Sequence, residues 1–199
     1  MRKIYILLLL LPALVYSQEI AKVGTVGSQF LKIGVGARGA GMGGAYEAVT
    51  NDVTSVFWNP AGLVYVEKTS VFLSHTEWLA DIGYEAIAVG HNFGENIGVF
   101  GLHVCYLNSG DIEETTMESP NGTGDNFNVS DLLVGLSYGR RLTNQFAFGA
   151  NVKLVREQLD DQTSTAWATD LGITYFTGFK SIRLGMSIRN FGPEIQLSG

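Results

Sequence analysis

Long segments of alternating apolar and polar residues are the feature that most constrains the fold of this 199-residue chain. Within residues 145–158, Phe148 and Val152 share one parity, and Gly149 and Lys153 share the other. A period of two sends successive side chains to opposite faces of a β-strand. The sequence therefore predicts an all-β, antiparallel meander of seven segments, spanning residues 69–78, 82–93, 97–107, 128–140, 145–158, 166–176 and 181–190.

The lengths of the segments and of their connections indicate where this sheet lies. Most segments are about twice the roughly 5–6 residues usual for soluble strands. Short turns at 94–96 and 143–144 alternate with longer polar stretches at 108–126 and 160–165. Only 16% of the residues are charged, against about 25% in soluble globular proteins. These features favour a transmembrane antiparallel β-barrel over a soluble β-sandwich or barrel, which would show the same alternation.

The first residues have the layout of an export signal. Arg2 and Lys3 precede an apolar run over residues 4–16, and Ser17 offers a small residue for cleavage. This run is shorter than the ~20 residues that a membrane-spanning helix needs, which disfavours an uncleaved anchor. We expect residues 1–17 to form a signal peptide that is removed on export.

Residues 18–67 differ from the rest of the chain because glycine is concentrated there. Glycine allows close approach of backbone in a confined space, and Pro60 pushes Asn59 toward extended geometry. We therefore expect a packed, non-catalytic segment that precedes the strands. Its structural motif residues are Gly34, Gly36, Gly39, Gly41, Gly43, Gly44, Asn59, Pro60 and Gly62.

Several chemistries can be weighed against this fold. Residues 34–39 and 39–44 match G-x-G-x-x-G, but a dinucleotide site needs a βαβ unit, and hairpin-length turns join the segments here. His75, His91 and His103 fall in three strands without metal-ligand spacing. The net charge of -6 comes without any basic block. We expect no enzyme activity, no cofactor, no metal and no nucleic-acid partner.

Charged and aromatic residues take characteristic places in the predicted strands. Aromatic side chains near segment ends, among them Trp78, Tyr84 and Trp167, fit an interfacial girdle. Five charged residues fall on the polar parity, so we expect them to face a lumen together and to pair with one another. They are Asp131, Lys153, Asp170, Arg183 and Arg189.

Residues 24–63 resemble the N-terminal region of the PorV/PorQ family, outer-membrane proteins of the wider FadL-like barrel group. The resemblance rests on the ARGAGMGGAYE run at 37–47, the Asn51-Asp52 pair and the WNPAGL block at 58–63. It implies a 14-stranded barrel in the outer membrane of a Gram-negative bacterium, with an N-terminal plug in the lumen. Residues 68–199 would then be the first half of the barrel, the chain an N-terminal fragment, and 108–126 an outer loop.

The same resemblance implies two functions, and neither is enzymatic. PorV-like proteins serve type IX secretion: they receive the C-terminal signal domains of exported cargo and shuttle them to the surface attachment machinery. FadL-like proteins instead pass hydrophobic small molecules through the barrel wall. The motif is closer to PorV/PorQ, so secretion ranks first. Outer-membrane lipid is one expected partner. Under the secretion hypothesis, cargo and secretion machinery would bind the loop at 108–127. Under the transport hypothesis, apolar solutes would bind in a pocket between plug and wall.

Overall fold

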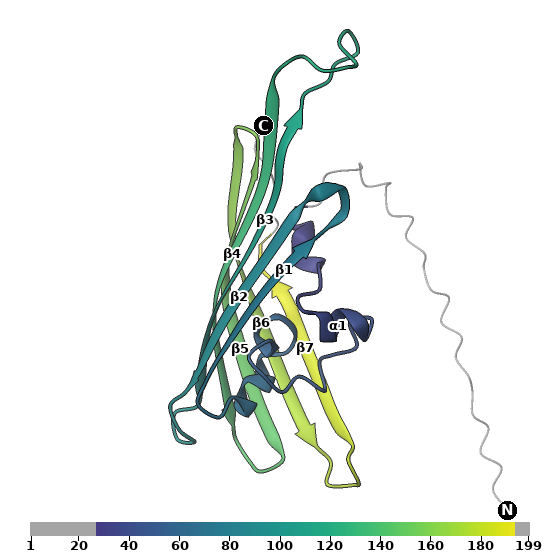
Figure 1. Ribbon diagram of the computed structural model, residues 1–199. Helices are drawn as coiled ribbons and strands as arrows, with labels where there is room; N and C mark the ends of the chain where they lie inside the picture. Colours follow the sequence, from purple (N-terminus) through teal and green to yellow (C-terminus); the bar gives the residue numbers. More distant parts are fainter. Residues whose placement is uncertain (1–26, 194–199) are drawn as a thin grey trace, which may run out of the picture.

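A computed structural model describes residues 27–193, and the strands in it form one antiparallel sheet in sequence order (Figure 1). The expected signal peptide lies outside the described residues, as does the start of the glycine-rich segment. The sheet is curved, and its concave side carries the N-terminal segment (residues 27–68). The strands are β1 (Thr69–Glu77), β2 (Gly83–Asn92), β3 (Val99–Glu113), β4 (Asn126–Arg141), β5 (Phe146–Leu159), β6 (Gln162–Phe176) and β7 (Arg183–Phe191).

The predicted all-β meander is confirmed, but two of its connections are shorter than predicted. β3 ends only at Glu113, and β4 begins already at Asn126. Together they form a long hairpin that projects at the top of Figure 1. The stretch 160–165 is not a loop, because β5 and β6 are joined at Asp160 and Asp161 alone. Beyond an apolar band, both faces of a strand can meet water, so pairing continues there without the alternation that marks a strand in the sequence.

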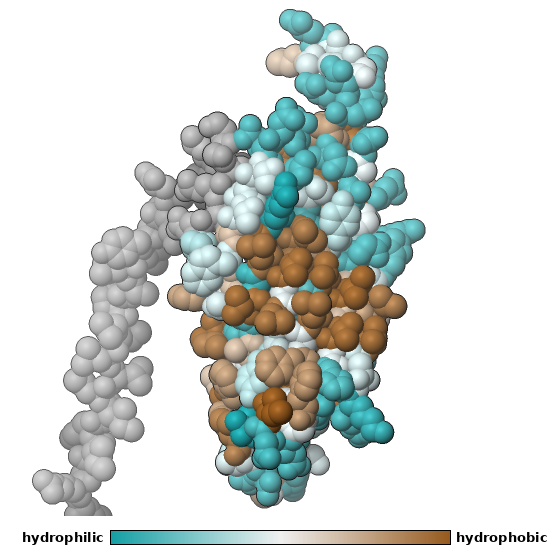
Figure 2. Space-filling view, turned by 90° about the vertical axis from the view of Figure 1, so that its left-hand side faces the viewer, coloured by the Kyte–Doolittle hydropathy of each residue, from teal (hydrophilic) through white to brown (hydrophobic). Residues whose placement is uncertain are grey.

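The convex face of the sheet carries an exposed apolar band (Figure 2). Polar side chains lie above and below this band in the same view. A continuous belt of this kind is typical of a barrel wall that faces lipid. The large apolar side chains that are exposed along the strands include Val71, Leu73, Ile87, Val89, Leu102, Leu132, Val134, Leu136, Val152, Leu154, Leu171, Leu184, Met186 and Ile188.

One of the aromatic residues assigned to the girdle faces the other way. Trp78 and Trp167 are exposed, but Tyr84 is buried on the concave side. It shares a parity with Ala86 and Ala88, which are also buried. The alternation of β2 is weak in the sequence because small apolar residues line its inner face. The sequence pattern therefore does not show on which face of the sheet Tyr84 lies.

The N-terminal segment is built of short helices, η1 (Gln29–Lys32), α1 (Ala37–Gly41), α2 (Ser55–Trp58) and η2 (Pro60–Tyr65). A further turn, η3 (Leu79–Asp81), joins β1 to β2. No helix among residues 27–193 is long and apolar enough to cross a membrane. The segment packs on the sheet through two apolar clusters. One contains Phe30, Val35, Tyr84, Ala86, Cys105, Leu107, Leu133 and Val155, and the other Val53, Val56, Leu63, Val66, Ala88 and Val99.

Candidate functional site

The contact between the N-terminal segment and the inner wall depends on a row of wall glycines. Gly139, Gly149 and Gly172 are direct register partners on β4, β5 and β6. A Cβ atom on Gly149 would lie within 3.0 Å of the backbone of Pro60 and Ala61. A Cβ on Gly139 would lie 2.9 Å from Leu63 Cβ, and one on Gly172 would overlap Asn59 Oδ1. Only glycine therefore allows η2 to rest directly on these strands.

This row was not predicted as a site, although the sequence carries a signal for it. The glycines fall on the polar parity of successive strands, where a lumen wall would otherwise carry hydrophilic side chains. Gly101 and Gly185 belong to the same pattern and face Val56 and Ala48 of the N-terminal segment. Glycine recurring at this parity is thus a pattern that indicates a packed lumen.

The glycines of the predicted motif play different parts. Gly34 and Gly39 pack against the Trp58 ring, and Gly62 against Thr50 and Ser55, with no room for a Cβ at Gly39 or Gly62. Gly41 has open space around it. Gly36, Gly43 and Gly44 have positive φ angles, which side chains other than glycine rarely adopt.

Asn59 makes three side-chain hydrogen bonds, one of which joins the N-terminal segment to the sheet. Its side chain is fully buried. Nδ2 donates to the carbonyl oxygens of Glu47 at 2.9 Å and Ile173 at 3.1 Å. Oδ1 accepts a hydrogen bond from the backbone N–H of Ala61 at 3.1 Å. Asn59 is extended at φ -147°, and Pro60 opens η2, as expected from the geometry that proline imposes on the preceding residue.

Replacing Asn59 with alanine should lower the free energy of unfolding by about 2–3 kcal/mol, because buried partners lose their hydrogen bonds. Urea unfolding in lipid vesicles measures the change. Asn144→Ala, in an exposed turn, is the matched control and should be near neutral. Equal stabilities for the two variants would contradict the role given to Asn59.

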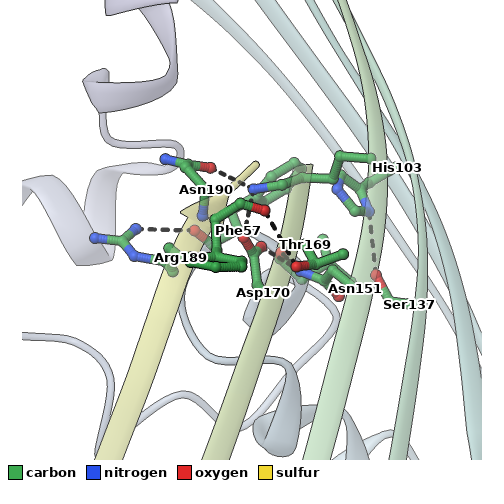
Figure 3. A network of polar contacts seen from close by, with 11 residues as sticks. Phe57, His103, Ser137, Asn151, Thr169, Asp170, Arg189 and Asn190 are labelled. Carbon is green, nitrogen blue, oxygen red and sulfur yellow. Dashed lines mark hydrogen bonds and ion pairs between the residues drawn. The ribbon is translucent and has the colours of Figure 1, made fainter. Parts of the chain in front are cut away.

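Two of the five predicted lumen charges, Lys153 and Asp170, form a buried ion pair. Figure 3 shows Asp170 with its neighbours Asn151 and Asn190. Lys153 Nζ lies 2.6 Å from Asp170 Oδ1, and the side chains are 6% and 2% exposed. Asp170 also accepts hydrogen bonds from Asn190 N at 2.7 Å and Asn151 Nδ2 at 2.8 Å. Asn151 Nδ2 in turn donates to the carbonyl of Val56 at 2.8 Å. The network therefore reaches from the wall to α2.

The other three charged residues form no ion pair with Lys153 or Asp170; Arg189 lies 3.8 Å from Glu47 Oε1 instead. Arg189 donates to the Phe57 carbonyl at 3.1 Å. Arg183 donates to the Ala48 carbonyl at 3.3 Å and stacks on the Phe176 ring at 4.4 Å. The two arginines thus bind the backbone of the N-terminal segment. Asp131 faces inward from β4, away from both groups, beside its register partner Glu157.

The histidines are also separated. His103 is buried and contacts Ser137 Oγ through Nδ1 at 3.1 Å, whereas His75 and His91 are exposed beside Glu85 and Thr69. No group of three or more His, Cys, Asp or Glu side chains that could hold a metal ion occurs in the part of the chain that the structure describes.

A small cavity lies between the N-terminal segment and the wall. Its volume is about 70 Å³, and its lining includes Phe57, Tyr84, His103 and Lys153. Pockets for small organic ligands usually measure ~300–1,000 Å³ and are mostly apolar. A wider depression of about 490 Å³ lies at the end of the sheet that carries the short turns, where Arg140 is among its polar lining residues. Neither cavity has the size and lining that an acyl chain needs.

The segment-to-wall contact is thus a packed, hydrogen-bonded joint on the inner face of a sheet whose outer face is suited to lipid. No curated protein and no solved structure matches the chain. Residues 16–198 match the protein family described as type IX secretion system protein PorV. The chain therefore belongs to the PorV family of type IX secretion.

Proposed function

We propose that this protein receives the C-terminal signal domains of secreted cargo at the outer membrane and shuttles them to the surface attachment machinery. Family membership supports a role in type IX secretion, and the apolar band on the convex face supports a place in the outer membrane. In this proposal residues 18–67 act as a plug, and residues 68–199 form the first half of a barrel that follows a cleaved signal peptide.

The observation that carries the proposal is the packed joint between the N-terminal segment and the wall. Asn59, Arg183 and Arg189 hold the segment through backbone carbonyls, and the wall glycines leave no gap beneath η2. Cargo would therefore meet the protein at an end of the barrel rather than along this inner face. The β3–β4 hairpin, which extends beyond the other connections in Figure 1, is the most accessible element for this contact.

The charge of the hairpin defines the surface that it would recognise. No lysine or arginine occurs between residues 69 and 139. Complementary charge steers association and selects partners, so the cargo domain should present a basic face. The acidic residues of the hairpin are Asp111, Glu113, Glu114, Glu118 and Asp125.

Removing three of the five acidic charges of the hairpin should weaken cargo capture about tenfold. The variant Glu113→Gln/Glu114→Gln/Glu118→Gln, tagged in the complete chromosomal gene, would be extracted gently and its bound proteins quantified by mass spectrometry. Glu67→Gln/Glu95→Gln removes charge at the opposite end of the sheet and is the control. Unchanged cargo recovery in the hairpin variant would show that cargo binds elsewhere.

The alternative function, FadL-like transport of apolar solutes, is tested in the same preparation. It needs an apolar pocket between the N-terminal segment and the wall, and the cavity found there is small and partly lined by charged side chains. We therefore rank it second. Bound fatty acids or other apolar molecules, recovered without any protein partner, would favour transport over secretion.

A further inference from the structure

Two acidic side chains lie next to each other on the inner face near the upper end of the sheet. Asp131 of β4 and Glu157 of β5 are direct register partners, and such partners have Cβ atoms about 4.5–5.5 Å apart. Glu157 is only 8% exposed, and Asp131 is partly buried. Two like charges at this spacing repel each other, and burying them without a counter-charge is costly.

The register partners that flank this pair carry no positive charge. The flanking register partners are Leu107 on β3 and Ser164 on β6. Lys153, the nearest inward-facing base on β5, is held by Asp170. Within residues 27–193, no lysine or arginine forms an ion pair with Asp131 or Glu157.

Oxygen atoms without partners also lie at this place. Glu157 Oε1 accepts a hydrogen bond from the backbone N–H of Ser28, at the start of the N-terminal segment. Glu157 Oε2 is buried and has no hydrogen-bond partner, and the same holds for Ser28 Oγ. A buried, unpartnered carboxylate oxygen calls for an explanation in a folded protein. Glu157 is the register partner of Asp131, and its other carboxylate oxygen is hydrogen-bonded to Ser28.

We propose that Asp131 and Glu157 bind a Ca²⁺ ion, with Ser28 Oγ as a third ligand. The donors are all hard oxygen atoms, which suit calcium rather than a transition metal. Calcium accepts irregular sets of 6–8 oxygen atoms, and water can reach the open side of Asp131 to complete the set. The two charges of the ion balance the two carboxylates. The ion joins the start of the N-terminal segment to β4 and β5.

Calcium binding by the purified, chelator-treated protein tests this site directly. Isothermal titration with CaCl₂ should give a Kd of about 10⁻⁴–10⁻³ M, as in extracellular calcium modules, and Ca²⁺ should raise the Tm. Asp131→Asn and Glu157→Gln should each weaken binding at least about tenfold, because each removes a charged ligand. Glu118→Gln, in the exposed hairpin, should bind Ca²⁺ like the wild type.

Trypsin cleavage after Lys32, which lies close to Ser28 and is accessible, gives an independent measurement. Ca²⁺ should slow this cleavage in the wild type and leave it unchanged in Asp131→Asn. Asp131 is less buried than Glu157, so its isosteric variant supplies the result even if Glu157→Gln does not fold.

Two results would overturn the proposal. Calcium affinity that is the same in the wild type and both variants would place the ion on the hairpin or on bound lipopolysaccharide. A wild type that Ca²⁺ neither binds nor stabilises, together with a Glu157→Gln variant more stable than the wild type, would show that the two carboxylates share a proton instead.

Discussion

Asp170→Asn is expected to destabilise the protein by about 3–5 kcal/mol, the usual cost of removing one partner of a buried ion pair. Lys153 would lose its counter-charge in a place where its side chain is 6% exposed. Asn151 and Asn190 would lose a charged acceptor at the same time, and Asn151 is the residue that reaches Val56 in α2. Urea unfolding of the protein in lipid vesicles, followed by tryptophan fluorescence, measures the loss.

Three further variants separate the buried charge from the loss of hydrogen bonds. Lys153→Met alone should also be costly, because it leaves Asp170 unpaired. The double variant Lys153→Met/Asp170→Asn should lose less stability than the sum of the two single losses, because no unpaired buried charge remains. Arg38→Gln breaks an exposed ion pair with Asp52, whose side chains are 61% and 36% exposed, and should cost less than about 1 kcal/mol. A similarly small loss in Asp170→Asn would contradict the importance of the buried pair.

Gly149→Val should prevent the N-terminal segment from docking on the wall. Even the Cβ atom of the new side chain would lie within 3.0 Å of the backbone of Pro60 and Ala61. Backbone atoms cannot relieve this overlap by a change of rotamer, as a flexible side chain could. Overpacking alone costs ~1–3 kcal/mol. Because separation of η2 from β5 also breaks neighbouring hydrogen bonds, we expect a total loss above about 3 kcal/mol. The loss is measured by the same unfolding experiment, together with faster trypsin cleavage of the N-terminal segment.

Gly41→Ala is the matched glycine variant. Gly41 lies in α1 with no atom within 4 Å of an added Cβ, and alanine is favoured over glycine in a helix by roughly 0.5–1 kcal/mol. It should therefore leave stability unchanged or raise it. If Gly149→Val unfolds at the same urea concentration as Gly41→Ala, the wall glycines are not what positions η2.

The sheet could be predicted from the sequence because alternation is a local property. The residue pattern within a single strand shows which side chains share a face, as Leu132, Val134 and Leu136 do on β4. The prediction was wrong at 160–165, where polar residues continue β6, and for Tyr84 on β2. In both places the two faces of the strand differ little in polarity. At 160–165 both faces can meet water, and on β2 apolar residues lie on both faces.

The joint could not be predicted in the same way, because its partners are far apart in the chain. Alternation placed Lys153 and Asp170 on the inner face but could not show that they are adjacent while Arg183 lies with Ala48. The sequence predicts an extended Asn59 before Pro60, but the hydrogen bond of Asn59 to Ile173 depends on how the segment lies across the sheet. The family resemblance predicts a plug, and only three-dimensional packing identifies the wall glycines on which η2 lies.

The long reach of these bonds sets the order in which the molecule can assemble. Asn59 binds a carbonyl 114 positions later, and Arg189 returns to one 132 positions earlier. The N-terminal segment can therefore complete these contacts only after β6 and β7 have been synthesised. Contacts of such high sequence separation form slowly. Until they form, the incompletely folded chain has unpaired polar groups and is prone to aggregate. The joint between the N-terminal segment and the wall is thus expected to form late in folding, once β6 and β7 are in place.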